Sequence, residues 1–71
     1  MASELIRTLE RGGWVTVRQR GSHLRLENPN RPLNPVTVAV HANRDLPEGT
    51  LRAVLRRAGL SREEFETLRR G

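Results

Sequence analysis

Residues 13–27 read GWVTVRQRGSHLRLE, and this stretch decides the fold. Apolar and polar residues alternate along it with a period of two, which is typical of β-strands that are buried on one side. We therefore predict strands at WVTVR (14–18) and HLRLE (23–27). The Arg20-Gly21-Ser22 segment between them is short enough to make the two strands an antiparallel hairpin.

A third strand is predicted at VTVAVH (36–41), where the alternation returns. The segment before it, NPNRPLNP (28–35), is rich in proline and asparagine and is predicted to be a connecting turn. Strands that follow one another in sequence usually lie side by side. We therefore expect a meander in which the second strand lies between the first and the third.

The segment before the strands has helical periodicity instead. Apolar residues at helical spacing predict a first helix over residues 4–11, with Ser3 as its N-cap. Gly12 and Gly13 are suited to end this helix.

A second helix is predicted from about Pro47 to Ala58, because its apolar residues form one continuous face. These residues are Leu51, Val54, Leu55 and Ala58. The start of the helix has two interpretations. Asp45 and Glu48 can form a capping pair, whereas Pro47 disfavours helical geometry at the residue before it and favours a later start. Gly59 is suited to end the helix.

A short third helix is predicted to run to about Arg69. Ser61 and Glu64 have the spacing of a capping box, and Leu60 and Phe65 have the spacing of a hydrophobic staple. Together the elements predict an α+β fold, α-β-β-β-α with a three-stranded antiparallel meander, helices on one face and a short additional C-terminal helix.

The chain is strongly basic, with a net charge of +5 and an isoelectric point near 11.6. All 13 basic residues are arginine. The planar guanidinium group pairs with phosphate through two parallel hydrogen bonds, which suits nucleic acid, although an arginine-only composition can equally reflect the genome or a hot habitat. Between Trp14 and Arg44 five arginines stand against one glutamate, a net of +4, so the positive charge is concentrated in the middle of the chain.

Length and composition exclude several classes of protein. Seventy-one residues suffice for one thin core, and we expect residues 1–71 to form a single domain. The absence of cysteine excludes disulfides and thiolate metal sites. Apolar runs are short and the N-terminal MASELIRTLE is charged and amphipathic, so we expect no membrane span, no signal peptide and a cytoplasmic location.

Strand alternation places both histidines on one face of the sheet. The residues expected to face the helices are Leu24, Leu26, Val36, Val38 and Val40. The opposite face receives His23, Arg25, Glu27, Thr37, Ala39 and His41. Because His23 opens the second strand and His41 closes the third, the two imidazoles should share one end of this face. Arg18 and Arg20 arrive at the same corner from the first strand.

In the first strand the same alternation gives Val15 and Val17 the inward positions. Trp14 then falls on the outward side. Alternatively, it packs at the end of the sheet below Gly13.

A histidine among arginines suits the cleavage of RNA. This reaction takes a proton from a 2′-hydroxyl, gives one to the departing 5′-oxygen and builds negative charge around phosphorus. Imidazole titrates near neutral pH and can perform either proton transfer, and arginine can stabilise the charge. The candidate catalytic residue is His23, with His41 as a second candidate proton carrier. The candidate RNA-binding residues are Arg18, Gln19, Arg20, Gly21, Ser22, Arg25 and Arg44.

Plainer explanations exist for the same residues. A histidine on the exposed face of a strand can simply be a tolerated polar residue. Gly21 and Ser22 suit an ordinary hairpin turn, whether or not the turn also holds a phosphate. The proposed chemistry requires no metal or cofactor, and two histidines without cysteine are a poor ligand set for zinc.

Three longer segments follow one another in a recognisable order. They are GWVTVRQRGSH (13–23), VTVAVH (36–41) and LPEGTLRAVLRRAGL (46–60). Together they resemble the HicA family of bacterial toxins. The resemblance implies a fold similar to the double-stranded RNA-binding domain, ribonuclease activity on mRNA, and neutralisation by a cognate HicB antitoxin. The active-site histidine of the family falls on His23.

The chain departs from that family at three places. Leu24 stands where many relatives have a second histidine, and its inward position suggests little catalytic consequence. Ala39 stands where relatives often have proline. The predicted third helix lies beyond the point at which some relatives end.

The leading hypothesis is therefore a metal-independent endoribonuclease toxin, an mRNA interferase, with RNA and a HicB-type antitoxin as partners. One alternative is an RNA-binding module without catalysis, in which the same arginines bind and the histidines are incidental. Another is a protein-docking domain whose open sheet face receives another protein. The sequence leaves the oligomeric state open.

Overall fold

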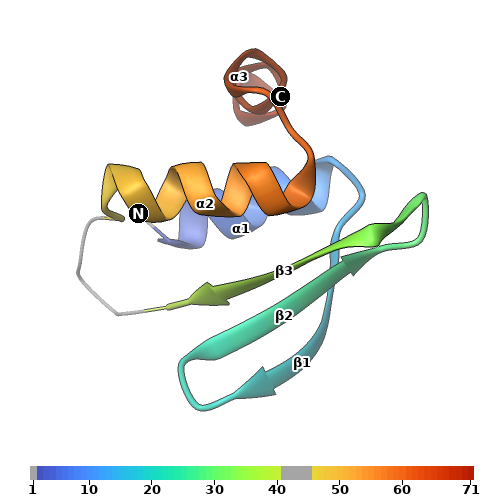
Figure 1. Cartoon of the computed structure of the whole chain (residues 1–71), viewed down its shortest axis with the longest axis vertical. Coiled ribbons are helices and arrows are strands. Elements are labelled where there is room, and N and C mark those ends of the chain that lie inside the picture. Colours follow the sequence, from blue (N-terminus) through green and yellow to red (C-terminus); the bar gives the residue numbers. More distant parts are fainter. Residues whose placement is uncertain (1, 41–45) are drawn as a thin grey trace.

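The computed structural model describes residues 2–40 and 46–71. It contains three helices and a three-stranded antiparallel sheet in the predicted order (Figure 1). The elements are α1 (Ala2–Arg11), β1 (Val15–Arg20), β2 (His23–Asn28), β3 (Arg31–Ala39), α2 (Glu48–Ala58) and α3 (Arg62–Arg70). β2 is the central strand, so the predicted α+β meander is confirmed.

The core lies between the sheet and the two helices α1 and α2, which lie over the same face of the sheet (Figure 1). Each element contributes the apolar side chains that its periodicity places inward. The buried apolar residues are Leu5, Leu9, Trp14, Leu26, Val36, Val38, Val54, Leu55, Ala58, Leu60 and Phe65. The inward positions predicted for β2 and β3 are thus correct, with Leu24 and Val40 partly buried against the same core.

The predicted orientation of the first strand is wrong. Trp14 is only 2% exposed, and its indole N–H donates to the carbonyl oxygen of Asn34 at 3.0 Å. Val15 and Val17, in contrast, are 54% and 51% exposed. Because Trp14 takes the inward position at the entrance to β1, alternation turns Val15 to the outer face, opposite Glu27.

A β-bulge then changes the alternation of β1. Thr16 pairs with Leu26, and the next paired residue is Arg18, which lies opposite Arg25. Val17 is therefore an extra residue, and a bulge of this kind shifts the direction of the following side chains by one position. Arg18 consequently lies on the outer face, as predicted, although the prediction reached that result through the wrong alternation.

The third strand begins five residues earlier than predicted. The connecting turn is only Pro29 and Asn30, and β3 includes most of the segment that we expected to be loop. Pro32 and Pro35 are tolerated because β3 is an edge strand, where a missing N–H removes no essential ladder bond. Between the Asn28–Arg31 and Leu26–Val36 pairs the register shifts, so the pairing of β2 and β3 is irregular at this end.

The start of α1 differs from the sequence prediction, whereas α2 has the later start that Pro47 favours. Ser3 lies inside α1, which begins at Ala2, so it is not the N-cap. The N-cap of α2 is Pro47, with no side-chain capping bond, and Asp45 lies outside the described residues. α2 ends as predicted, because Gly59 adopts the left-handed conformation (φ 72°).

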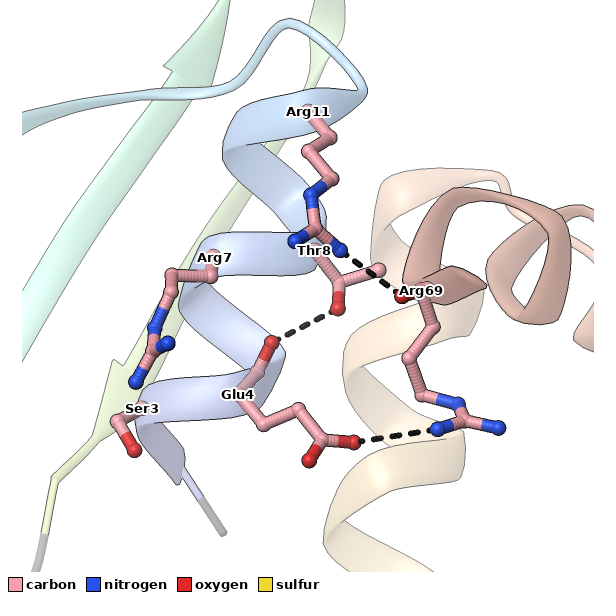
Figure 2. Close-up of a pocket in the computed structure, with 6 residues that line it drawn as sticks. All are labelled: Ser3, Glu4, Arg7, Thr8, Arg11 and Arg69. Carbon is pink, nitrogen blue, oxygen red and sulfur yellow. Dashed lines mark hydrogen bonds and ion pairs between the residues drawn. The ribbon is translucent and has the colours of Figure 1, made fainter. Parts of the chain in front are cut away.

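The predicted capping box of α3 is confirmed by reciprocal bonds. The Glu64 backbone N–H donates to Ser61 Oγ at 3.0 Å, and the Ser61 backbone N–H donates to Glu64 Oε1 at 2.9 Å. The other end of α3 is held against α1 (Figure 2), since Arg11 donates to the carbonyl oxygens of Leu68 and Arg69. No helix among the described residues is long and apolar enough to cross a membrane.

Candidate active site

His23 is the first residue of β2 and is exposed to solvent. It pairs with Arg20 of β1 on one side and with Ala39 of β3 on the other. Paired residues of antiparallel strands project their side chains from the same face. The helices lie over the other face (Figure 1). The imidazole is therefore presented on the uncovered side of the sheet, on the same face as the side chain of Arg20.

The next pair along the hairpin adds two more arginines to this face. Arg18 lies opposite Arg25. Arg25 forms an ion pair with Glu27, in which Nε and Oε2 are 3.1 Å apart. Arg18 and Arg20 form no ion pair with any residue that the structure describes, and both are exposed. Their charges remain available to an external anion, whereas the charge of Arg25 is partly compensated.

The turn that leads into His23 is fixed on both sides. Gly21 has a φ of 58°, a left-handed conformation that glycine adopts without steric cost. The Gln19 side chain donates to the Gly21 carbonyl oxygen at 3.3 Å, and the Val40 N–H donates to the Ser22 carbonyl oxygen at 2.6 Å. The predicted role of Gln19 as an RNA contact therefore competes with a role in shaping the turn.

Two predicted site residues, His41 and Arg44, lie outside the described residues. Ala39, which pairs with His23, is the last residue of β3, and His41 follows it by two positions in the sequence. The pairing of two imidazoles at this corner therefore stays a prediction.

Arg31, which contributed to the predicted basic segment, has a structural role. Its guanidinium lies 5.7 Å from the centroid of the Trp14 ring and donates to the carbonyl oxygens of Ala58 and Gly59 at the end of α2. Such a cation–π contact, with hydrogen bonds to helix-terminal carbonyls, stabilises the fold. The basic charge that faces solvent on the sheet is therefore that of Arg18 and Arg20.

A second group of arginines lines a hollow of about 300 Å³ between α1 and α3 (Figure 2). Two of its members already have partners. Arg11 binds helix-terminal carbonyls, and Arg69 pairs with Glu66 at 3.0 Å and Glu4 at 3.7 Å. None of the described residues that line this hollow is a histidine, and it has less uncompensated positive charge than the corner around His23. In the described ranges, no cluster of three or more His, Cys, Asp or Glu side chains is placed to bind a metal ion.

A second hollow, of about 390 Å³, was not predicted. It lies on the outer face of the sheet and is largely apolar. Its lining residues are Val15, Val17, Arg25, Glu27, Asn28, Pro29, Pro32 and Pro35. The hollow could not be predicted from an alternation that places both valines in the core. The one available signal was Trp14, whose size favours burial and whose inward placement turns Val15 outward.

The fold and this corner define a small basic α+β protein that presents a histidine and two uncompensated arginines on the open face of an antiparallel sheet. Residues 2–60 match the model of the family described as HicA toxin of bacterial toxin-antitoxin, and the chain belongs to this family. The match ends before α3, so this helix lies outside the matched region. α3 packs against α1, which lies inside it. No curated protein matches the chain.

Proposed function

We propose that this toxin is a metal-independent endoribonuclease that cleaves mRNA, with His23 as the general acid or general base. The observation that carries the proposal is the Arg20–His23 pair at the turn end of the β1–β2 hairpin. It places a proton-transfer group beside a cation on a face that a flexible RNA strand can reach. Membership in a toxin family is consistent with an activity that harms the cell.

In the proposed reaction, the 2′-oxygen of one ribose attacks the adjacent phosphorus while a base removes its proton. The bond from phosphorus to the 5′-oxygen of the next nucleotide breaks, and an acid protonates that oxygen. The products are a 2′,3′-cyclic phosphate and a free 5′-hydroxyl. His23 performs one of the two proton transfers, and His41 is the candidate for the other.

Arg18 and Arg20 are proposed to bind the phosphate at which cleavage occurs. Both are exposed on the face that carries His23, and guanidinium groups stabilise the negative charge that builds up around phosphorus. Backbone N–H groups of the Gly21–Ser22 turn and the Arg44 side chain are further candidates. Arg25 is expected to contribute less, because Glu27 compensates its charge.

The proposed partner that controls this activity is a HicB-type antitoxin. A toxin–antitoxin family implies an inhibitory partner in general. A protein that covers His23 would block access of RNA to the site. If it also neutralises Arg18 and Arg20, it would remove the positive potential that attracts RNA. We expect its coding sequence beside that of this chain, and both proteins to act in the cytoplasm.

The decisive experiment incubates the purified chain with a single-stranded RNA in excess EDTA. Cleavage that leaves a cyclic phosphate supports the proposal, provided that His23→Ala, prepared identically, cleaves the RNA far more slowly. RNA binding without cleavage would instead favour the non-catalytic RNA-binding module. The absence of both RNA binding and RNA cleavage would favour a protein-docking domain.

A further inference from the structure

The two edges of the sheet differ in their capacity to accept another strand. β3 forms one edge and contains Pro32 and Pro35, which have no N–H to donate. Its register with β2 is also interrupted next to these prolines. Prolines and irregular pairing are two ways in which natural proteins block strand addition. The β3 edge is therefore a poor template for a further strand.

The β1 edge is interrupted once, by the bulge at Val17, but residues 18–20 pair regularly with β2. The six residues of β1 contain no proline and are all exposed, and no strand of the described part of the chain lies on its outer side. An edge strand of this kind presents backbone N–H and C=O groups that can pair with an incoming strand. At 3.2–3.4 Å per residue, six residues span about 20 Å. This length is sufficient for backbone pairing with one incoming strand.

The side chains of β1 form two regions on the outer face. Val15 and Val17 line the apolar hollow at the entrance to the strand, and Arg18 and Arg20 follow at the end that leads to His23. A strand docked along β1 would therefore run from an apolar recess to two exposed cations. The recess suits one apolar side chain, and the cations suit carboxylates.

The same charges select against a second copy of this chain as the occupant. Pairing of two β1 strands would bring the two exposed arginines of each copy onto neighbouring strands of one sheet, where their like charges repel. The whole chain also carries a net charge of +5. An acidic partner is the occupant with complementary charge.

We propose that β1 is the docking edge for an extended acidic segment of the antitoxin, which adds a fourth strand to the sheet and inserts an apolar side chain into the hollow at Val15 and Val17. This inference rests on the proposed function, since it specifies how the inhibitory partner binds. Strand addition at β1 would place acidic side chains over Arg18 and Arg20. Substrate would then lose its phosphate contacts even before His23 is covered.

The test introduces a glutamate on each of the two edges and compares the two variants. Val17→Glu places a carboxylate on the β1 edge beside the hollow, where it should repel an acidic strand. Leu33→Glu makes the same change in β3 at a side chain that is 91% exposed and does not line the hollow. Each variant is mixed with the protein encoded by the neighbouring gene, and the dissociation constant is measured. We expect Val17→Glu to weaken the complex at least tenfold and Leu33→Glu to leave it within twofold.

Two further measurements make the comparison conclusive. Thermal unfolding of both variants should match the parent chain, because neither residue contributes to the buried core. Residue-resolved amide exchange in the complex should show slower exchange at alternate positions of β1 on each side of the bulge at Val17. A contact made by side chains alone would not produce this alternation.

The outcomes separate this inference from the proposed function. A complex that forms equally well with Val17→Glu, or that loses equal affinity with Leu33→Glu, would overturn the β1 docking edge and leave the antitoxin assignment intact. A complex without alternating protection on β1 would do the same. Absence of any complex with the protein encoded by the neighbouring gene would overturn both the β1 docking edge and the antitoxin assignment.

Discussion

Arg20 and His23 face one another across the β1–β2 hairpin as the last pair before the Gly21–Ser22 turn. Their side chains leave the sheet on the side away from the helices, and both are exposed. A change at either residue therefore removes little buried surface. This relationship allows the chemical role of His23 to be tested separately from its contribution to the fold.

His23→Ala is expected to slow RNA cleavage by about 10² to 10⁴-fold, which is the usual effect of removing a general acid or base. The free energy of unfolding should change by less than about 0.5 kcal/mol, as for other surface substitutions. RNA binding should persist, because Arg18 and Arg20 remain. Single-turnover cleavage, urea unfolding and a binding titration check the three expectations.

His41→Ala provides the comparison for this variant. The loss of rate should be comparable to that of His23→Ala if the two histidines divide the acid and base roles, and smaller if His41 only assists. Full cleavage and full growth inhibition by His23→Ala would show that His23 is an ordinary surface residue, and the proposed mechanism would be wrong.

The affinity for RNA should depend steeply on salt. Each neutralised phosphate of a single strand contributes about −0.7 to the slope of log affinity against log salt concentration, so three or four contacts give roughly −2 to −3. The double change of Arg18 and Arg20 to glutamine should make the slope about 1.4 units less steep on the same rule. Arg25→Gln is the matched control and should change the slope less, because Arg25 is paired with Glu27.

The salt measurement has a clear contrary result. Equal slopes for the parent chain and the Arg18 and Arg20 double variant would mean that RNA binds elsewhere. The hollow between α1 and α3 would then become the next surface to mutate, beginning with Arg7.

Periodicity was sufficient to predict β2 and most of the helices but not the orientation of β1. In β2 one face is covered by helices, so burial and alternation agree at Leu24 and Leu26. β1 is an exposed edge strand, and its valines reflect β-propensity rather than burial. Alternation in such a strand does not indicate which face is inward. The bulge at Val17 adds a shift that no local pattern reveals.

The early start of β3 was missed for a related reason. A segment with three prolines reads as a loop unless it is already known to form a sheet edge, and that information is tertiary. The predicted positions of His23 and of the turn before it agree with the structure, because both depend only on the hairpin. The position of His41 depends on residues beyond β3 and is still a prediction.

Trp14 should be the residue whose change destabilises the hairpin entrance most. Trp14→Phe removes the hydrogen bond to the Asn34 carbonyl and leaves part of the indole volume empty. An unsatisfied polar group of this kind costs about 1–3 kcal/mol. Val15→Ala, next in sequence but half-exposed, should cost about 0.5 kcal/mol or less. Urea unfolding of both variants checks the contrast, and equal destabilisation would contradict the inward placement of Trp14.

Stability should fall in acid through two carboxylates of the helical layer. Hydrogen bonds from the Arg62 side chain lower the pKa of Glu48 below its ordinary value of 4.5, and the Ser61 backbone N–H and hydroxyl lower the pKa of Glu64 in the same direction. A carboxyl whose pKa is lower in the folded state binds protons more weakly there than in the unfolded chain. Its contribution is therefore fully present above pH 4.5 and is lost as the pH falls through the lowered pKa.

Replacing both residues, by Glu48→Gln and Glu64→Gln, should make stability fall less steeply below pH 4.5. The pH dependence of stability near pH 7 should not change. Glutamine still accepts the hydrogen bond from the Ser61 N–H, so the cap on α3 is retained while its titration is removed. Glu63→Gln serves as the control, because Glu63 is exposed and forms no ion pair within the described residues. Thermal unfolding between pH 3 and pH 7 measures the three profiles. An unchanged acid limb in the double variant would mean that other carboxylates control the acid sensitivity of this fold.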